Sequence, residues 1–155
     1  QITNEQRWKL EAEALLDEHS FSQDFIEAFH TTWTVAAHHI RSQIGDDRKL
    51  VKLLRQLLPK YDGPNIKLYR GENLERWREK QVGFCWTRSV ETARMFGRRL
   101  NATGMGGVLL VCQCSAASII AGPSKHSEYL GEEEFTVDPF RIERIVVAET
   151  YPSSE

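Results

Sequence analysis

Helical periodicity dominates the first third of this chain and ends abruptly. Apolar residues recur three, four and seven positions apart up to Leu58, and Pro59 follows. This spacing predicts amphipathic helices. After a Gly-Pro turn at 62–65 the apolar runs become short and are separated by polar turns, which is typical of strands. We therefore expect an α+β fold in a single domain of 155 residues, with a helical lobe over 1–60 and a β core over 61–150.

Three helices are expected in the lobe. The first begins near a capping box at 3–6, and the second covers 22–45, from a serine N-cap to a glycine stop. The third begins at Asp46 or Asp47 and stops at Pro59. Their apolar and aromatic stripes are expected to form a helical layer that packs on the β core.

The second part of the chain predicts a mixed or antiparallel sheet. Its apolar runs are bounded by glycine, proline and polar residues, and Ser89 can cap a helix between two of them. A glycine-rich loop is expected over 97–107 and a polar loop over 122–131. The expected strands cover 66–69, 81–86, 108–114, 118–121, 132–137 and 142–148.

The overall composition is that of an ordinary globular protein, with 41% hydrophobic and 27% charged residues. The formal net charge of -2 argues against nucleic acid as a partner, since proteins that bind it usually carry a basic excess. No apolar run is long enough to span a bilayer, so no membrane association is expected. The chain starts at Gln1 without a methionine, so the sequence leaves open whether a leader segment precedes it.

The cysteines Cys85, Cys112 and Cys114 are odd in number, which favours a reducing compartment such as the cytoplasm over a disulfide framework. Cys112 and Cys114 lie two positions apart on an expected strand, so both sulfurs point to the same face. No second Cys or His pair stands at zinc spacing. We interpret the two as small core residues rather than half of a metal site, and expect no metal.

Three short polar blocks stand out in the β core. In the first, Arg70 ends an apolar strand next to Gly71. A guanidinium offers a planar fork that suits phosphate oxygens, and a glycine lets a ligand approach the backbone closely. The alternative is a surface arginine paired with Glu72, and Arg70 taken alone favours that alternative.

The second block is Cys85-Trp86-Thr87, shortly before the Ser89 cap. One interpretation is a hydroxyl that orients a carboxylate and supports a bound ligand. The other is simply a strand end followed by a helix cap.

The third block is a run of glutamates, Glu132 to Glu134, that opens an apolar strand. Strand alternation puts Glu132 and Glu134 on one face, and Glu133 on the other with Phe135 and Val137. From alternation alone, a solvated strand start is the simpler interpretation. Three consecutive glutamates are nevertheless unusual in a strand, because like charges repel and glutamate has low β propensity. Function is one candidate reason for them.

Together the blocks resemble the ADP-ribosyltransferase family, in the branch with an arginine, a Ser-Thr-Ser turn and a Glu-x-Glu strand. Leu68 to Gly71 is similar to the first motif, and Glu132 to Glu134, followed by an apolar strand and a proline, is similar to the third. Cys85-Trp86-Thr87 stands where the turn would lie but differs from it in its first two residues. The resemblance covers about 66–148. It implies an ADP-ribosyltransferase-like sheet with an N-terminal helical lobe, and NAD as substrate.

The resemblance also implies roles for single residues. Glu134 would be the catalytic glutamate, which hydrogen-bonds a ribose hydroxyl and stabilises the cation that forms as nicotinamide leaves. Glu132 would orient the acceptor. Arg70 would hold the diphosphate of NAD, the Gly71 backbone would meet the nicotinamide amide, and Thr87 would support Glu134.

Four further expectations concern the edges of this site. Arg98 or Arg99 would be a second phosphate contact, and Tyr129 a contact to the acceptor. Cys85 would be a poorer hydrogen-bond partner than the family's serine. Trp86 would cover the nicotinamide pocket or fill it.

The implied activity is NAD-dependent mono-ADP-ribosyl transfer to a protein acceptor, and arginine is an acceptor that this branch often uses. The family also implies a bacterial toxin or effector, acting in the cytoplasm or delivered into that of a target cell, with an inhibitor or antitoxin as a partner. Two alternatives stay open. One is an NAD glycohydrolase, and the other is a degenerate domain that binds a nucleotide or a protein without chemistry.

Overall fold

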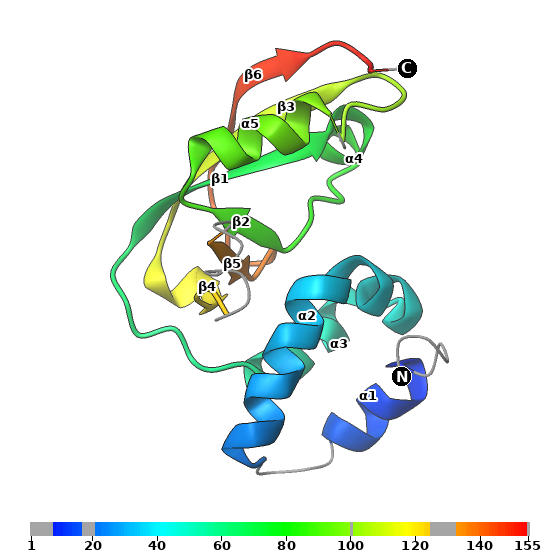
Figure 1. The fold of residues 1–155 in the computed structure, drawn as a ribbon, viewed down its shortest axis with the longest axis vertical. Helices are drawn as coiled ribbons and strands as arrows, with labels where there is room; N and C mark the ends of the chain where they lie inside the picture. The colour runs from blue at the N-terminus through cyan, green and yellow to red at the C-terminus, as the bar shows by residue number, and fades with distance from the viewer. Residues whose placement is uncertain (1–7, 17–20, 100, 125–132, 155) are drawn as a thin grey trace.

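The computed structural model is an α+β protein, in which a lobe of three N-terminal helices lies beside a six-stranded sheet (Figure 1). The α+β prediction is confirmed. The structure describes residues 8–16, 21–99, 101–124 and 133–154.

The lobe has three helices among the described residues, and the second and third begin where local sequence signals predict. They are α1 (Trp8–Leu16), α2 (Gln23–Ile44) and α3 (Asp47–Leu57). The Ser22 hydroxyl accepts a hydrogen bond from the Phe25 backbone N–H at 3.1 Å, and Gly45 ends α2 in the left-handed region with φ of 68°. The Asp46 carboxylate accepts from the first N–H groups of α3. The predicted capping box at 3–6 lies outside the described residues.

The sheet is antiparallel at every pairing between described strands, in the order β4-β5-β2-β1-β3-β6. Two helices, α4 after β1 and α5 after β2, connect its strands. The elements are β1 (Ile66–Asn73), α4 (Leu74–Arg78), β2 (Cys85–Thr87), α5 (Val90–Arg98), β3 (Gly107–Cys114), the 3-10 turn η1 (Ala116–Ser118), β4 (Ile119–Ala121), β5 (Glu134–Val137) and β6 (Ile145–Tyr151).

Several predicted strand boundaries are wrong. β1 runs on to Asn73, and β2 begins at Cys85 rather than at residue 81. β5 begins at Glu134 because Glu133 has a φ of 46°, in the left-handed region, and so leaves the extended conformation. Glu133 is therefore not a strand residue alternating with Glu134.

The helical lobe and the sheet share a hydrophobic core. The core cluster of the lobe includes Phe84, Ile120 and Ala121, which come from the sheet side. The indole N–H of Trp33 on α2 also donates to the Thr136 hydroxyl on β5 at 2.9 Å. These contacts fix α2 against β5, which carries Glu134, and confirm that the aromatic stripe packs in the core.

Helix α5 lies unusually close to β1 and β3, across one face of the sheet (Figure 1). A Cβ atom on Gly71 would stand 2.1 Å from the Ala93 carbonyl oxygen, and one on Gly107 would stand 1.9 Å from that of Gly97. Only glycine permits this approach. The requirement for glycine at position 71 thus comes from helix packing.

None of the helices in the described part of the chain is long and apolar enough to cross a membrane.

Candidate functional site

One row of side chains crosses three neighbouring strands. Thr87 on β2 lies opposite Tyr69 on β1 and opposite Glu134 on β5. Directly opposed residues of an antiparallel pair share a face, with Cβ atoms about 4.5–5.5 Å apart. Thr87 and Glu134 are therefore neighbours, which is the arrangement that the predicted support of Glu134 by Thr87 requires.

Arg70 lies where β1 and β2 separate. The two strands pair at Tyr69 and Thr87. Arg70 is the next residue of β1, and its guanidinium extends to the backbone of Cys85 on β2. Nη1 of Arg70 donates to the Cys85 carbonyl oxygen at 2.7 Å. A Cβ on Gly83 would meet Nη2 of Arg70 at 2.1 Å, so the absence of a side chain there makes room for the guanidinium.

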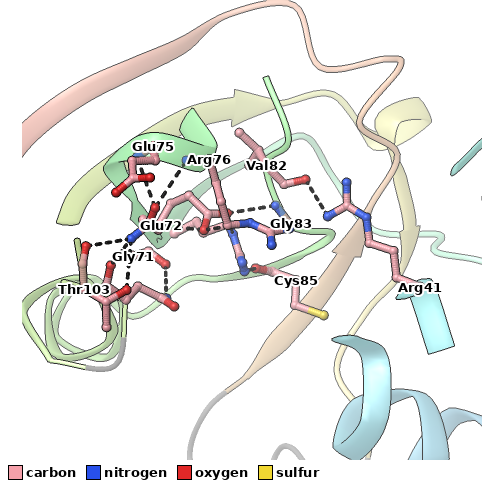
Figure 2. A network of polar contacts seen from close by, with 12 residues as sticks. Arg41, Gly71, Glu72, Glu75, Arg76, Val82, Gly83, Cys85 and Thr103 are labelled. Atoms are coloured by element: carbon pink, nitrogen blue, oxygen red, sulfur yellow. Dashed lines mark hydrogen bonds and ion pairs between the residues drawn. The ribbon is translucent and has the colours of Figure 1, made fainter. Parts of the chain in front are cut away.

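A buried carboxylate, Glu72, holds Arg70 in place. Figure 2 shows Glu72 close to Gly83 and Arg76. The Glu72 side chain is 1% exposed. Oε2 accepts from Nε of Arg70 at 2.8 Å and from the Gly83 backbone N–H at 2.9 Å, while Oε1 accepts from the Asn73 backbone N–H at 2.9 Å. Nε of Arg76 lies 3.7 Å from Oε1. We call these five residues the Glu72 network.

The network keeps Glu72 and Arg70 charged. Burial by itself would raise the pKa of Glu72, but the positive charge of Arg70 and the hydrogen bonds from Gly83, Arg70 and Asn73 outweigh it, and the pKa lies below its usual value. Burial likewise opposes the charge of Arg70, yet the carboxylate of Glu72 raises the pKa of the guanidinium above its usual value. The pair is ionised at neutral pH.

Two adjoining cavities open around this arrangement. The first, of about 260 Å³, lies between the sheet and α5, and the second, of about 430 Å³, lies between the sheet and α2. Together they fall in the usual range of about 300–1,000 Å³ for small-molecule sites. Both are lined by Arg70, Cys85, Asn101 and Glu134.

Six of the predicted site residues gather at the first cavity. Its walls include Arg70, Gly71, Cys85, Trp86, Thr87 and Glu134. The carbonyl oxygen of Gly71 accepts from the Asn101 side-chain amide at 2.8 Å. The Thr87 hydroxyl accepts from the Ser89 backbone N–H at 3.0 Å and so also shapes the turn before α5.

Cys85 and Trp86 have distinct surroundings. Burial and the nearby charge of Glu134 raise the pKa of the Cys85 thiol to about 12, so it stays protonated at neutral pH. Trp86 is 1% exposed, lies opposite Phe135 and packs in the core cluster of the sheet. Much of the indole therefore belongs to the core, although Trp86 also borders the first cavity.

The remaining predicted residues are not gathered there. Arg98 is exposed, and its guanidinium lies 5.4 Å from the ring centre of Tyr151 on β6; neither Arg98 nor Arg99 lines the two cavities. The predicted contacts Glu132 and Tyr129 lie outside the described residues.

Glu133 faces a different part of the molecule from Glu134. Its carboxylate accepts from Nη2 of Arg88 at 2.5 Å, and both residues line a third cavity with Phe135 and Tyr61. The left-handed backbone at Glu133 thus separates it from the wall that Glu134 borders.

Cys112 and Cys114 are buried in the core cluster of the sheet, where the sequence analysis expected them. A hydrogen bond to Cys112, together with burial, raises the pKa of the Cys114 thiol. Among the described residues, no group of three His, Cys, Asp or Glu side chains is placed to hold a metal ion.

Sequence reasoning missed several cleft residues, among them Asn101, which lines both cavities. The sequence predicts Glu72 only as a surface partner of Arg70, and it gives no functional role to Arg41 or Arg76, although both line the second cavity. The sequence does contain a signal for the contacts of Glu72 with the two arginines. Arg70 and Glu72 stand two positions apart on a strand, and Glu72 and Arg76 stand four positions apart across a helix start. The burial of Glu72 had no sequence signal.

No protein-family model matches the chain, and no curated protein or solved structure matches it either.

Proposed function

We propose that this protein is an NAD-dependent mono-ADP-ribosyltransferase with an ADP-ribosyltransferase-like fold, which transfers ADP-ribose to a protein acceptor. One observation carries the proposal. Arg70, anchored by Glu72, and Glu134, opposite Thr87 in the strand register, line the same two adjoining cavities. An anion-binding group and a carboxylate thus border one cleft.

The chemistry of the cleft fits a dinucleotide substrate. The Arg70 guanidinium makes two hydrogen bonds within the described chain, to Glu72 and Cys85. A guanidinium has five N–H groups, so Arg70 can bind phosphate oxygens while it stays anchored. Glu134 and Thr87 would then lie at the ribose and nicotinamide end.

Glu134 acts at the step in which the glycosidic bond breaks. The bond between the ribose carbon and the nicotinamide nitrogen cleaves, and nicotinamide leaves with the electron pair. The Glu134 carboxylate stabilises the positive charge that develops on the ribose. A nucleophilic group of the acceptor then bonds to the same carbon and releases its proton.

Cys85 takes no part as a nucleophile. A thiol whose pKa is raised to about 12 is almost wholly protonated at neutral pH, and the thiolate is the reactive form. The contribution of Cys85 to the cleft is its backbone carbonyl, which holds Arg70.

The test is to incubate the protein with NAD labelled in its adenosine half, with and without cell lysate as the source of acceptor. We expect release of free nicotinamide and a label that becomes covalently attached to protein. Arg70→Ala should reduce both, because the phosphates lose their anchor. Urea unfolding of the variant must show that it still folds, since Glu72 also loses its partner. Nicotinamide release without labelled protein would favour a glycohydrolase. NAD binding by calorimetry without any release would favour the degenerate binding domain and overturn the enzyme.

A further inference from the structure

We propose that Arg76 is the second arm of a diphosphate site whose first arm is Arg70. The inference rests on the proposed function, since it assigns the phosphates of the same substrate. It replaces Arg98 and Arg99, which do not line the two cavities, with a residue of α4 that lines the second one.

Both guanidiniums converge on one carboxylate. Nε of Arg70 lies 2.8 Å from Oε2 of Glu72, and Nε of Arg76 lies 3.7 Å from Oε1 of the same side chain. Figure 2 shows Glu72 with Arg76 and Gly83 beside it. The two arginines are therefore held next to each other although they come from different elements.

Glu72 does not depend on Arg76. Its two oxygens already accept from Arg70 and from the backbone N–H groups of Asn73 and Gly83. Among the described residues, the Arg76 guanidinium makes ion-pair contact with Glu72 but no hydrogen bond. Its N–H groups thus remain for a ligand, and its side chain is 36% exposed.

The charge balance also favours an anion. The guanidiniums and carboxylates that line the second cavity sum to one positive charge: Arg41, Arg70 and Arg76 against Glu72 and Glu134. The neighbouring Arg41 is already satisfied, because it makes a bidentate pair with Asp47 and donates to the Val82 carbonyl. Arg70 and Arg76 are therefore the pair best suited to two linked phosphates, which planar guanidinium forks bind well.

The ligand class is a nucleoside diphosphate, and ADP is the probe. Calorimetry would measure the affinities of wild type and Arg76→Ala for ADP and for adenosine. The matched control is Arg78→Ala, which removes an exposed arginine from the same helix that does not line the cavities. We expect Arg76→Ala to bind ADP about tenfold more weakly, with the affinity for adenosine and that of Arg78→Ala for ADP unchanged.

The inference is overturned if wild type does not bind millimolar ADP, or if Arg76→Ala binds ADP as tightly as wild type. Equal losses in Arg76→Ala and Arg78→Ala, or equal losses for ADP and adenosine, would also overturn it. This experiment measures binding and not turnover, so its outcome can be distinguished from failure of the proposed enzymatic function. ADP binding that depends on Arg76 can stand without nicotinamide release, and release can occur without it.

Discussion

Two carboxylates border the same cleft and differ in what surrounds them. Glu72 is 1% exposed and is held by hydrogen bonds from Arg70 and two backbone N–H groups, with Arg76 in ion-pair contact at 3.7 Å. Glu134 is half-buried at the first residue of β5 and lines both cavities. The comparison teaches that a fully buried carboxylate held by an arginine and backbone N–H groups supports the structure, whereas a half-buried one that borders both cavities can serve chemistry.

The largest expected effect is on stability, at the structural carboxylate. Glu72→Ala leaves the Arg70 charge and the Gly83 N–H without their partner, and breaking a buried pair in this way costs about 3–5 kcal/mol. Urea unfolding measures this loss, with Glu79→Ala as an exposed control nearby. A loss below about 1 kcal/mol would place Glu72 among ordinary surface pairs and remove the contrast with Glu134.

The second prediction concerns the glycine between Arg70 and Glu72. Gly71→Ala brings a Cβ within 2.1 Å of the Ala93 carbonyl, so α5 must move, at about 1–3 kcal/mol of unfolding free energy. The matched control is Gly122→Ala, whose Cβ would meet nothing closer than 3.8 Å. Equal stability of the two variants in urea would show that α5 does not depend on this close approach.

The third prediction concerns the pH dependence of stability at His30, where helix α2 of the lobe contacts the backbone of Gly122. Burial lowers the pKa of His30 from 6.5, and a hydrogen bond with the Gly122 backbone offsets only part of that. The unfolded chain therefore binds the proton first, and stability falls as the pH drops below about 6.5 towards the lower folded pKa. In His30→Gln, the unfolding free energy should fall less between about pH 7.5 and pH 5.5 than in wild type. An identical decrease would contradict this.

The smallest effect is expected at Cys85. Because its thiol is protonated at neutral pH and its carbonyl holds Arg70, Cys85→Ser should change the rate of nicotinamide release by no more than about twofold. A tenfold loss would contradict this, because it would show that the Cys85 thiol itself takes part in the reaction together with Glu134.

Local signals predicted much of the fold. The Ser22, Asp46 and Ser89 caps fixed three helix starts, because a capping hydrogen bond involves residues adjacent in sequence. The structure also places Arg70 and Glu134, from the first and third blocks of the sequence, on the wall of one cavity.

Features that depend on distant contacts were not predictable in the same way. The burial of Glu72 needs α4 and the Gly83 segment folded around it. The direction of Arg98 depends on how α5 lies against Tyr151. The left-handed backbone at Glu133 has no marker in the sequence, since glutamate rarely adopts it.

The most direct test of the central claim is the rate of nicotinamide release from NAD by Glu134→Gln, beside wild type. Gln preserves the shape of the side chain and removes its negative charge. The account predicts a rate at least about 100-fold lower, with an unfolding midpoint in urea close to that of wild type. Release by Glu134→Gln at the wild-type rate would contradict the account, because the carboxylate on the cavity wall would then not be the group that acts.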